Sequence, residues 1–339
     1  MCAAPALDRV RGLLLGTAVG DALGLPAEGL SPRTIARRFG ALDRYRLLGR
    51  TGFVSDDTEQ AALVAQSLLH ARGDVDAARR AFRAALRGWF LCLPFGIGLA
   101  TLRACLRLLL GLQRSGVHSA GNGAAMRMAV VGAYAWADVE LRRRLATALA
   151  EVTHLDERAV EGAVFVASVA AGCLVAAAPA DRQQAVAHAV AAVRAPELRT
   201  ALQRALALAD ARAQDAAHEL GTDGFVLRSL PWATWCLLTH GDRPVEALRV
   251  CIRGGGDTDT NAAILGAWLG ALHGAAALPE PLVTSLAPGP FGRDHLDALA
   301  GALCAGTPPP RYRRVLALLR NLALYPVILA HGFRRLLPF

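Results

Sequence analysis

Residues 254–260 read Gly-Gly-Gly-Asp-Thr-Asp-Thr, and residues 55–58 read Ser-Asp-Asp-Thr. Each stretch gathers carboxylates and hydroxyls at the expected start of a helix, with more oxygen donors than a helix cap requires. Oxygen donors without His or Cys nearby favour Mg²⁺ or Mn²⁺ and argue against zinc. Because Asp57 and Asp257 lie 200 positions apart, a shared two-metal site would join both ends of the chain into one domain.

The two acidic stretches differ in how strongly they indicate a ligand. Asp56 and Asp57 are adjacent carboxylates that repel each other unless a cation lies between them, although helix capping explains a single carboxylate equally well. Before Asp257, three glycines permit positive φ angles and close approach of the backbone to a ligand. Asp257 and Asp259 are two residues apart in a turn, so both carboxylates can point toward one ion. The second stretch therefore predicts metal or phosphate binding.

The composition favours a helical fold. Hydrophobic residues make up 54% of the 339 residues and charged residues 19%, which indicates a compact chain. Alanine and leucine dominate, aromatic residues reach only 6%, and the alternation typical of strands is scarce. No repeat and no Gly/Ser-rich or Pro-rich linker divides the sequence. We therefore predict a single all-α domain.

Helical periodicity and breaker residues place the expected helices along the chain. The segment 7–22 is the first, and residues 30–54 form an Arg-rich loop region with one short helix. A helix over 58–71 has Asp57 as its N-cap and Gln60 at the capping-box position. The other expected helices span 74–88, 96–113, 123–136, 138–152, 157–178, 182–193, 196–217, 225–239, 243–252, 259–275, 292–304 and 312–336.

The chain contains no lysine, so all 37 basic residues are arginine, and the formal net charge is +9. Codon bias in a GC-rich genome explains the absence of lysine, and the positive charge also suits an anionic ligand such as a nucleotide diphosphate. Most arginines occur singly on the expected polar faces of helices, without interleaved aromatic residues. We therefore do not expect nucleic-acid binding.

Cysteine usage and hydropathy indicate the cellular compartment of the protein and whether it spans a membrane. The seven cysteines are odd in number, widely spaced and without a CxxC pair, which predicts neither disulfides nor a zinc site. No basic N-terminal region followed by an apolar run and a cleavage site is present. Residues 163–180 carry no charge, but Ala, Gly, Val and Ser predominate, so we expect a buried helix. These features predict a cytoplasmic protein without a transmembrane segment.

The C-terminal end differs from the rest of the chain. Residues 310–339 carry six arginines and no acid, and an apolar stretch over 322–329 lies between them. We expect one domain over 1–310 and a basic, apolar helical extension over 311–339 that packs on the same domain. Peripheral contact of this extension with a membrane or a partner is the alternative.

Five motifs resemble, in order, those of the ADP-ribosylglycohydrolases, the group that includes the dinitrogenase-reductase-activating glycohydrolase and the ADP-ribosyl-arginine and ADP-ribosyl-serine hydrolases. They are RGLLLGTAVGDALG at 11–24, SDDT at 55–58, GNGAAMR at 121–127, TH at 153–154 and GGDTDT at 255–260. Each motif alone is weak, whereas five in this order over residues 8–280 are specific. The chain departs from the family pattern in having Ala124 where Ser is common, and Glu280 where an aromatic residue often follows the proline.

The resemblance implies an orthogonal bundle of α-helices with two Mg²⁺ ions, replaceable by Mn²⁺, at the base of a cleft. The implied metal ligands are Ser55, Asp56 and Asp57 from one side and Asp257, Asp259 and Thr260 from the other. The implied substrate-binding residues are Gly121, Asn122, Gly123, His154, Gly255 and Gly256. The general base is Asp56 or Glu28. Simpler roles are a solvated loop carboxylate for Glu28, a turn residue for Asn122, a cap for His154 and a purely structural Asp21.

By the same resemblance, the expected activity is Mg²⁺-dependent hydrolysis at the anomeric ribose carbon, which removes ADP-ribose from a modified protein side chain or a small molecule. The transition state has oxocarbenium character, so the site must stabilise developing charge and deliver water. The linkage (arginine, serine, threonine, a nucleic-acid base or a metabolite) stays open. The alternatives are a non-catalytic ADP-ribose-binding or toxin-neutralising relative, and a Mg²⁺-dependent hydrolase acting on another nucleotide-like bond.

Overall fold

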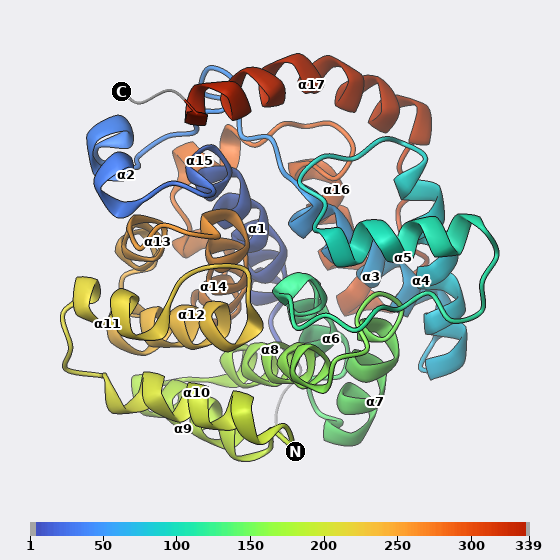
Figure 1. Ribbon diagram of the computed structural model, residues 1–339. Helices are drawn as coiled ribbons and strands as arrows, with labels where there is room; N and C mark the ends of the chain where they lie inside the picture. The colour runs from blue at the N-terminus through green and yellow to red at the C-terminus, as the bar shows by residue number, and fades with distance from the viewer. Residues whose placement is uncertain (1–4, 337–339) are drawn as a thin grey trace.

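The computed structural model describes residues 5–336, and its regular elements are α-helices joined by loops and short 3-10 turns (Figure 1). Over this described part of the chain there is no strand, and only isolated bridges pair loop residues. The all-α, single-domain fold expected from the composition is confirmed. Cys2 and the outer ends of both expected ranges, 1–310 and 311–339, lie outside the described residues.

Figure 1 shows α1 and α14 near the middle of the molecule, with the other helices arranged around them. The helices are α1 Leu7–Gly24, α2 Pro32–Phe39, α3 Asp56–Ala71, α4 Val75–Phe90, α5 Leu99–Leu109, α6 Ala129–Tyr134, α7 Val139–Ala150, α8 Glu157–Val175, α9 Pro179–Ala191, α10 Pro196–Ala207, α11 Ala213–Leu220, α12 Val226–His240, α13 Pro244–Arg253, α14 Thr258–His273, α15 Glu280–Thr284, α16 Arg293–Ala305 and α17 Arg314–Leu336. The 3-10 turns are η1 Leu25–Ala27, η2 Asn122–Arg127 and η3 Ala275–Ala277.

The fold is organised around α1 and α14, which pack against each other backbone to backbone. Every fourth residue of α1 along this contact is a glycine, from Gly12 to Gly24. A Cβ atom on Gly16 would lie 2.1 Å from the carbonyl oxygen of Gly266, and one on Gly20 would lie 2.0 Å from a carbonyl oxygen of α14. Only glycine lets the two helix backbones approach so closely.

The antiparallel direction of this pair explains how the two ends of the chain meet. Gly12 faces Gly270, whereas Gly24 faces Thr258, so the C-terminal end of α1 lies against the N-terminal end of α14. The Thr258 hydroxyl donates a hydrogen bond to the carbonyl oxygen of Gly24 at 2.8 Å. The loop that follows α1 is thereby held beside the 254–260 stretch.

Replacing Gly16 by Ala is expected to destabilise the protein by about 3 kcal/mol, because the added methyl group must push two packed helices apart. Gly301→Ala in α16 is the control, since no atom lies within 4 Å of the added Cβ. Alanine favours a helix over glycine, so this control should gain about 0.5–1 kcal/mol. Urea unfolding measures both changes, and a Gly16→Ala protein as stable as the wild type would contradict the close packing.

Other helices bury the remaining faces of the central pair. Helices α3 and α16 pack against α1, whereas α8, α12 and α13 pack against α14. Trp268 of α14 is fully buried, and its indole N–H donates to the carbonyl oxygen of Val166 in α8 at 3.1 Å. Trp232 and Trp235 stack within α12 with ring centroids 5.3 Å apart. One continuous apolar core results.

Three sequence-based helix predictions are wrong. The helix expected over 123–136 is divided into the 3-10 turn η2 and the short helix α6. The helix expected over 58–71 begins two residues earlier, with Ser55 as its N-cap, so Asp57 is not the cap and Gln60 does not close a capping box. The single helix expected over 196–217 is divided into α10 and α11. No glycine or proline lies at this break, which is why the sequence does not reveal it.

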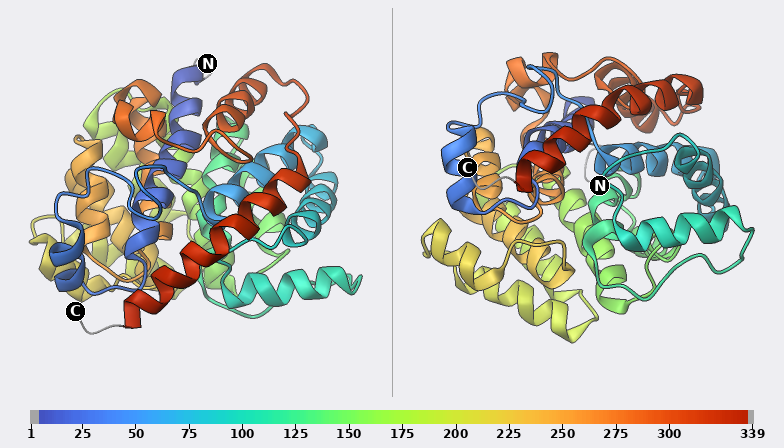
Figure 2. Two further views of the ribbon diagram at one scale, coloured as in Figure 1. Left: turned by 90° about the horizontal axis from the view of Figure 1, so that it is seen from above. Right: turned by 45° about the horizontal axis from the view of Figure 1, so that its top comes forward.

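Two helices of the described chain are long and apolar enough to cross a membrane, judged by length and composition alone. In the helix Glu157–Val175, 78% of the apolar window is buried, so the buried helix expected over 163–180 is confirmed as far as Val175, where the helix ends. The segment Arg314–Phe333 of α17 is only 17% buried, and Figures 1 and 2 show this helix on the outside of the molecule. The expected absence of a transmembrane segment stays a prediction.

Helix α17 crosses the surface mainly over loops. The ring nitrogen Nε2 of His331 lies 2.8 Å from the carbonyl oxygen of Leu47, and Asn321 Nδ2 donates to the carbonyl oxygen of Cys92 at 2.8 Å. A small apolar cluster beneath the helix consists of Leu25, Leu47, Phe95 and Leu324. Helix α17 therefore fastens loops that lie next to α1 and α3, while the expected domain boundary at residue 310 stays a prediction.

Candidate functional site

One cavity collects most of the predicted site residues. It has a volume of about 620 Å³ and lies where the N-terminal ends of α3, α5, α12, α14 and η2 converge. Its lining consists of Glu28, Gly29, Asp56, Asp57, Gly96, Gly98, Leu99, Ala100, Thr101, Ser119, Gly121, Asn122, Gly123, Met126, His154, Asp223, Gly224, Gly256, Asp257, Asp259 and Thr260.

Of the predicted site residues, all but Ser55 and Gly255 line this cavity. Ser55 is buried behind it, and its hydroxyl donates to Asp57 Oδ2 at 3.1 Å. Gly255 shapes the turn before α14 with a φ of 76°, and a Cβ there would lie 2.7 Å from the carbonyl oxygen of Leu30. The fold thus brings the two acidic stretches together, while the chemical roles of their residues stay predictions.

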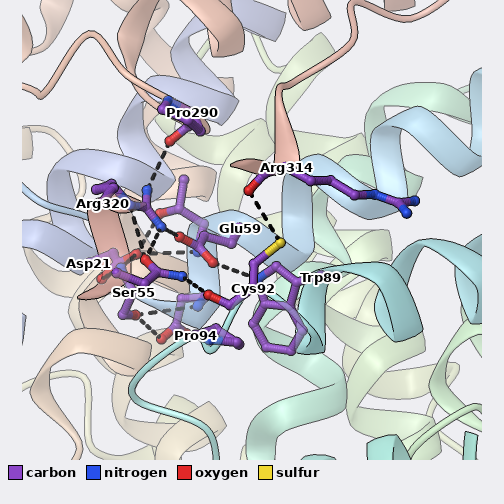
Figure 3. A network of polar contacts seen from close by, with 12 residues as sticks. Asp21, Ser55, Glu59, Trp89, Cys92, Pro94, Pro290, Arg314 and Arg320 are labelled. Atoms are coloured by element: carbon purple, nitrogen blue, oxygen red, sulfur yellow. Dashed lines mark hydrogen bonds and ion pairs between the residues drawn. The ribbon is translucent and has the colours of Figure 1, made fainter. Parts of the chain in front are cut away.

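The carboxylate of Asp21, near the end of α1, caps the start of α3. It is fully buried and accepts hydrogen bonds from the Ser55 N–H at 2.9 Å and from the Thr58 N–H and hydroxyl at 3.2 and 2.6 Å. Figure 3 shows Asp21 beside Ser55. These bonds show that Asp21 fixes the start of α3. Because Asp21 satisfies these donors, Asp56 and Asp57 can line the cavity instead of capping the helix.

Glycines turn the chain into α14 and place Asp257 at its N-terminus. Gly256 has a φ of 73°, and a Cβ there would lie 2.5 Å from a neighbouring backbone oxygen. Asp257 Oδ2 accepts a hydrogen bond from Asn122 Nδ2 at 2.7 Å, so the Asn122 side chain orients a predicted metal ligand. The Thr260 hydroxyl donates to Asp57 Oδ2 at 3.3 Å. This last bond directly connects the two acidic stretches.

Carboxylates crowd the cavity without a basic side chain to balance them. Asp56, Asp57 and Asp259 are buried, and burial together with the neighbouring carboxylates raises the pKa of each well above its usual range. Burial also raises the pKa of Asp21 to about 6. No arginine is among the lining residues. Such a group of acids must retain protons or bind a cation.

His154 is a neutral hydrogen-bonding group in the cavity wall. Burial and the nearby Arg127 lower the pKa of His154 to about 3. Arg127 donates to the Thr153 hydroxyl oxygen at 2.6 Å, and that oxygen lies 2.8 Å from His154 Nδ1. The Thr153 hydroxyl also lies 3.4 Å from the carbonyl oxygen of Ala150, so it has two acceptors for its single proton, and the tautomer of His154 depends on which of them receives it. The ring atom Nε2 faces the turn of residues 121–123.

A buried arginine that the sequence reasoning did not assign connects the cavity walls. Arg127 is fully buried and donates to Gln60 Oε1 at 2.7 Å and to the carbonyl oxygen of Gly123 at 2.7 Å. Gln60 Nε2 in turn donates to Asp56 Oδ2 at 2.9 Å. Arg127 therefore orients Asp56 from behind. Its sequence signal is a lone arginine in the apolar stretch 124–131.

Glu28 lies at the edge of the cavity, half-buried on the loop that follows η1. The N–H of Gly29 donates to the carbonyl oxygen of Gly256 at 2.7 Å, and the N–H of Gly256 donates to that of Leu30 at 3.2 Å. These two bonds tie the Glu28 loop to the turn that carries Asp257. The two candidate general bases thus differ in setting, since Asp56 is buried and Glu28 is partly open to solvent.

The donor chemistry of the cavity fits a hard divalent cation. Asp57 Oδ1 is buried without a hydrogen-bond partner, whereas Oδ2 of the same residue accepts from Ser55 and Thr260. An unpaired buried carboxylate oxygen calls for a further partner. Within residues 5–336, no three His, Cys, Asp or Glu side chains form by themselves a cluster that could hold a metal. Hydroxyl and water ligands are therefore needed besides the carboxylates, which is usual for Mg²⁺.

The sequence reasoning missed one wall of the cavity. This wall is formed by Gly96, Gly98, Leu99, Ala100 and Thr101, in and before the first turn of α5. Gly96 has a φ of 81°, and a Cβ there would lie 2.9 Å from Asp56 Oδ1. The sequence signal was the FGIG pattern at 95–98, whose glycines permit close approach of the backbone to Asp56.

The structure is an all-helical domain with an acidic cavity at converging helix N-termini. The family model for ADP-ribosylglycohydrolase matches residues 3–312. This chain therefore belongs to the ADP-ribosylglycohydrolase family, as its motifs predicted.

Individual relatives agree with this assignment. A protein of Archaeoglobus fulgidus described as uncharacterized is 33% identical over 306 residues, which cover 87% of this chain and 96% of the relative. ADP-ribosylarginine hydrolase Tri1 of Pseudomonas putida is 27% identical, with 88% of this chain and 78% of that protein covered. A solved structure described as an ADP-ribosylglycohydrolase-related protein complex superimposes with a TM-score of 0.69 at 28% identity, covering 89% of this chain and 98% of the other.

Proposed function

We propose that this protein is a Mg²⁺-dependent hydrolase that removes ADP-ribose from a modified protein side chain or a small molecule. Membership of the ADP-ribosylglycohydrolase family supports hydrolysis of an ADP-ribose linkage as the reaction. The observation that carries the proposal is the cavity, in which buried carboxylates from two distant stretches face one space with hydrogen-bond donors around them. A glycosidic bond at the anomeric carbon is the bond that such a site would break.

The residues that would hold two Mg²⁺ ions are Ser55, Asp56, Asp57, Asp257, Asp259 and Thr260. When bound, the ions would supply positive charge that orients ribose hydroxyls and lowers the pKa of water. The unpaired Asp57 Oδ1 is the oxygen best placed to bind a cation without losing a hydrogen bond. Asn122 would keep the Asp257 carboxylate in position through its bond to Oδ2.

The protein's own acids would stabilise the charge that develops on the ribose and take a proton from the attacking water. Asp56 or Glu28 is the proposed general base, because both line the cavity and both are carboxylates. Asp56 is held rigidly by Gln60, whereas Glu28 lies on the loop tied to Gly256.

The donors around the acids suit the diphosphate and the distal ribose of ADP-ribose. The turn of residues 121–123 and the neutral imidazole of His154 lie on the same wall. Helix N-termini favour anionic oxygens, and several of them converge here. Release of ADP-ribose from arginine-, serine- and threonine-linked model substrates, with Mg²⁺ and with EDTA, tests the proposed reaction.

Stability in Mg²⁺ is expected to exceed stability in EDTA by a larger margin at about pH 7 than at about pH 5. The folded-state pKa values of Asp21 (about 6), Asp56, Asp57 and Asp259 are raised, so the folded protein binds protons that the unfolded chain has released above its ordinary aspartate pKa of about 4. These aspartates therefore contribute to the free energy of unfolding below the unfolded-state pKa of about 4, and this contribution is lost as the pH rises through their folded-state pKa values.

A cation bound by Asp56, Asp57 and Asp259 removes their part of this loss, so the Mg²⁺ increment should grow by at least about 1 kcal/mol over this pH range. Urea unfolding measures the increment. Because it is a difference at one pH, it cancels the opposite contribution of His154, whose lowered pKa makes the protein less stable as the pH falls below about 6.5. An increment that is absent, or equal at both pH values, would speak against cation binding by these carboxylates.

A further inference from the structure

Helix α17 exposes an apolar stripe along its outer face. Val315, Leu319, Leu322, Leu329 and Phe333 follow one another at spacings of three, four and seven residues, which places them on one side of a helix. Their exposed fractions range from 49% for Leu322 to 68% for Val315 and Phe333. From end to end the stripe is about 27 Å long. Both views in Figure 2 show α17 on the outside of the molecule.

The opposite face of α17 already makes the contacts that hold the helix on the protein. Ala317, Asn321 and Leu324 are buried there, and Arg320 pairs with the buried Glu59 of α3. Because the inner face is satisfied, the outer stripe is not required to attach the helix. An amphipathic surface helix normally turns polar residues outward, so an apolar outer stripe indicates an external partner.

A basic basin lies beside the C-terminal end of α17. It is a cavity of about 480 Å³ lined by Pro26, Arg38, Phe39, Arg44, Arg46, Gly49, Arg50 and His331. Among the described residues that line it there is no carboxylate, although Asp43 lies 3.9 Å from Arg46. Arg46 Nε is buried without a hydrogen-bond partner, and Arg44 and Arg50 are exposed. The guanidinium groups of Arg44, Arg46 and Arg50 around one cavity suit a phosphate group.

We propose that the face formed by α17 and the basic basin docks on an anionic membrane surface. The outer stripe would enter the boundary between headgroups and acyl chains, while the basin receives a lipid phosphate. His331 lies on the inner side of α17, where its Nε2 is 2.8 Å from the carbonyl oxygen of Leu47, and it lines the basin, so the basin lies directly beside the helix that carries the stripe. The sequence from residue 298 to 339 contains no acid that would repel anionic lipids.

The charge on this face argues for a membrane rather than a second copy of the chain. A two-fold contact would use the same surface on both copies and bring like-charged basins toward each other. An anionic bilayer instead neutralises the arginines and accepts the apolar stripe. This inference does not depend on the proposed hydrolase activity.

The test is co-sedimentation of the full chain in EDTA with vesicles of phosphatidylcholine alone, or of equal parts phosphatidylcholine and phosphatidylglycerol. Wild type should sediment mainly with the phosphatidylglycerol vesicles. Leu322→Glu/Leu329→Glu should lower the partition coefficient by about ten-fold for each leucine. Val139→Glu, at an apolar position on α7 that is 67% exposed, is the control and should sediment like wild type.

The basin is tested by Arg44→Glu/Arg50→Glu, which should also lose sedimentation, and by inorganic phosphate, which should compete better than chloride at equal ionic strength. The proposal would be overturned if the wild type sediments equally with both kinds of vesicle or with neither. It would also be overturned if the leucine variant sediments like the wild type. A wild-type dimer that Leu322→Glu/Leu329→Glu converts to a monomer without any vesicle binding would overturn it as well. Retained sedimentation of the arginine variant would remove the basin from the docking face.

Discussion

The Asp257→Asn variant is expected to hydrolyse ADP-ribose linkages more than about 100-fold more slowly than the wild type. Losing a residue that only hydrogen-bonds to a metal ligand costs up to about 100-fold, and losing a ligand itself should cost more. Asp257 is proposed to bind a cation directly, and an amide is a weaker ligand than a carboxylate. The fold should persist, because Asn at this position can still accept the hydrogen bond from Asn122. The variant also removes one charge from a group of mutually repelling acids, so its metal-free stability should be unchanged or higher.

Asp223→Asn is the matched control for this variant. Asp223 also lines the cavity, but its side chain is 51% exposed and pairs with Arg228 at the surface. It is not a predicted metal ligand, so its loss should change turnover only a few-fold. Turnover in Mg²⁺ and binding of Mg²⁺ by calorimetry are measured for both variants. Wild-type turnover in Asp257→Asn would contradict the metal-binding role of this residue.

The Arg320→Ala variant is expected to destabilise the protein by about 3–5 kcal/mol, because it leaves a buried carboxylate without its cation. Glu59, in the first turn of α3, is buried and pairs with Arg320, which also donates to the carbonyl oxygen of Pro290 at 2.9 Å. The Trp89 indole N–H is a further donor to Glu59 (Figure 3). Since Glu59 adjoins the predicted metal ligands of α3, turnover should fall together with stability.

Arg313→Ala, an exposed arginine just before α17, is the control and should change stability by less than about 0.5 kcal/mol. The double variant Arg320→Ala/Glu59→Gln should recover most of the lost stability, because the unpaired charge is gone. Urea unfolding in EDTA gives all three values. If Arg320→Ala and Arg313→Ala change the free energy of unfolding equally, the ion pair between Arg320 and Glu59 does not hold α17 on the domain.

The sequence predicted the helical class and the acidic stretches because both depend on local composition and spacing. It did not reveal how the stretches meet. The recurring glycines of α1 and the facing glycines of α14 set that contact, and their role became visible only when the two helices were seen together. A small residue every fourth position, from Gly12 to Gly24, was the available signal.

The start of α3 was misplaced because two other caps act before Asp57, the local hydroxyl of Ser55 and the Asp21 carboxylate of another helix. Local capping rules favour the nearest acidic side chain, and this led to Asp57, whereas the Asp21 carboxylate reaches Ser55 and Thr58 across 34 and 37 positions. Tertiary capping of this kind leaves no local pattern. It is also what allows two adjacent aspartates to line the cavity.

The side chains that orient the site were harder to predict than those proposed to act in it. Acidic ligands occur in recognisable clusters, but Arg127 acts through hydrogen bonds to Gln60 and Thr153, which lie far from it in the sequence. The helical extension over 311–339 was similarly ambiguous, because apolar periodicity in the sequence does not reveal which face of a helix is covered. In α17 one face is packed and the other is exposed.

The most direct test of the account is release of ADP-ribose by the wild-type protein from arginine-, serine- and threonine-linked model substrates, in Mg²⁺ and in EDTA. The account predicts release from at least one linkage in Mg²⁺ and none in EDTA. Release that is equally fast in EDTA would contradict the role of the cation. Absence of release from all three linkages, together with no binding of ADP-ribose in calorimetry, would contradict the proposed function of the cavity.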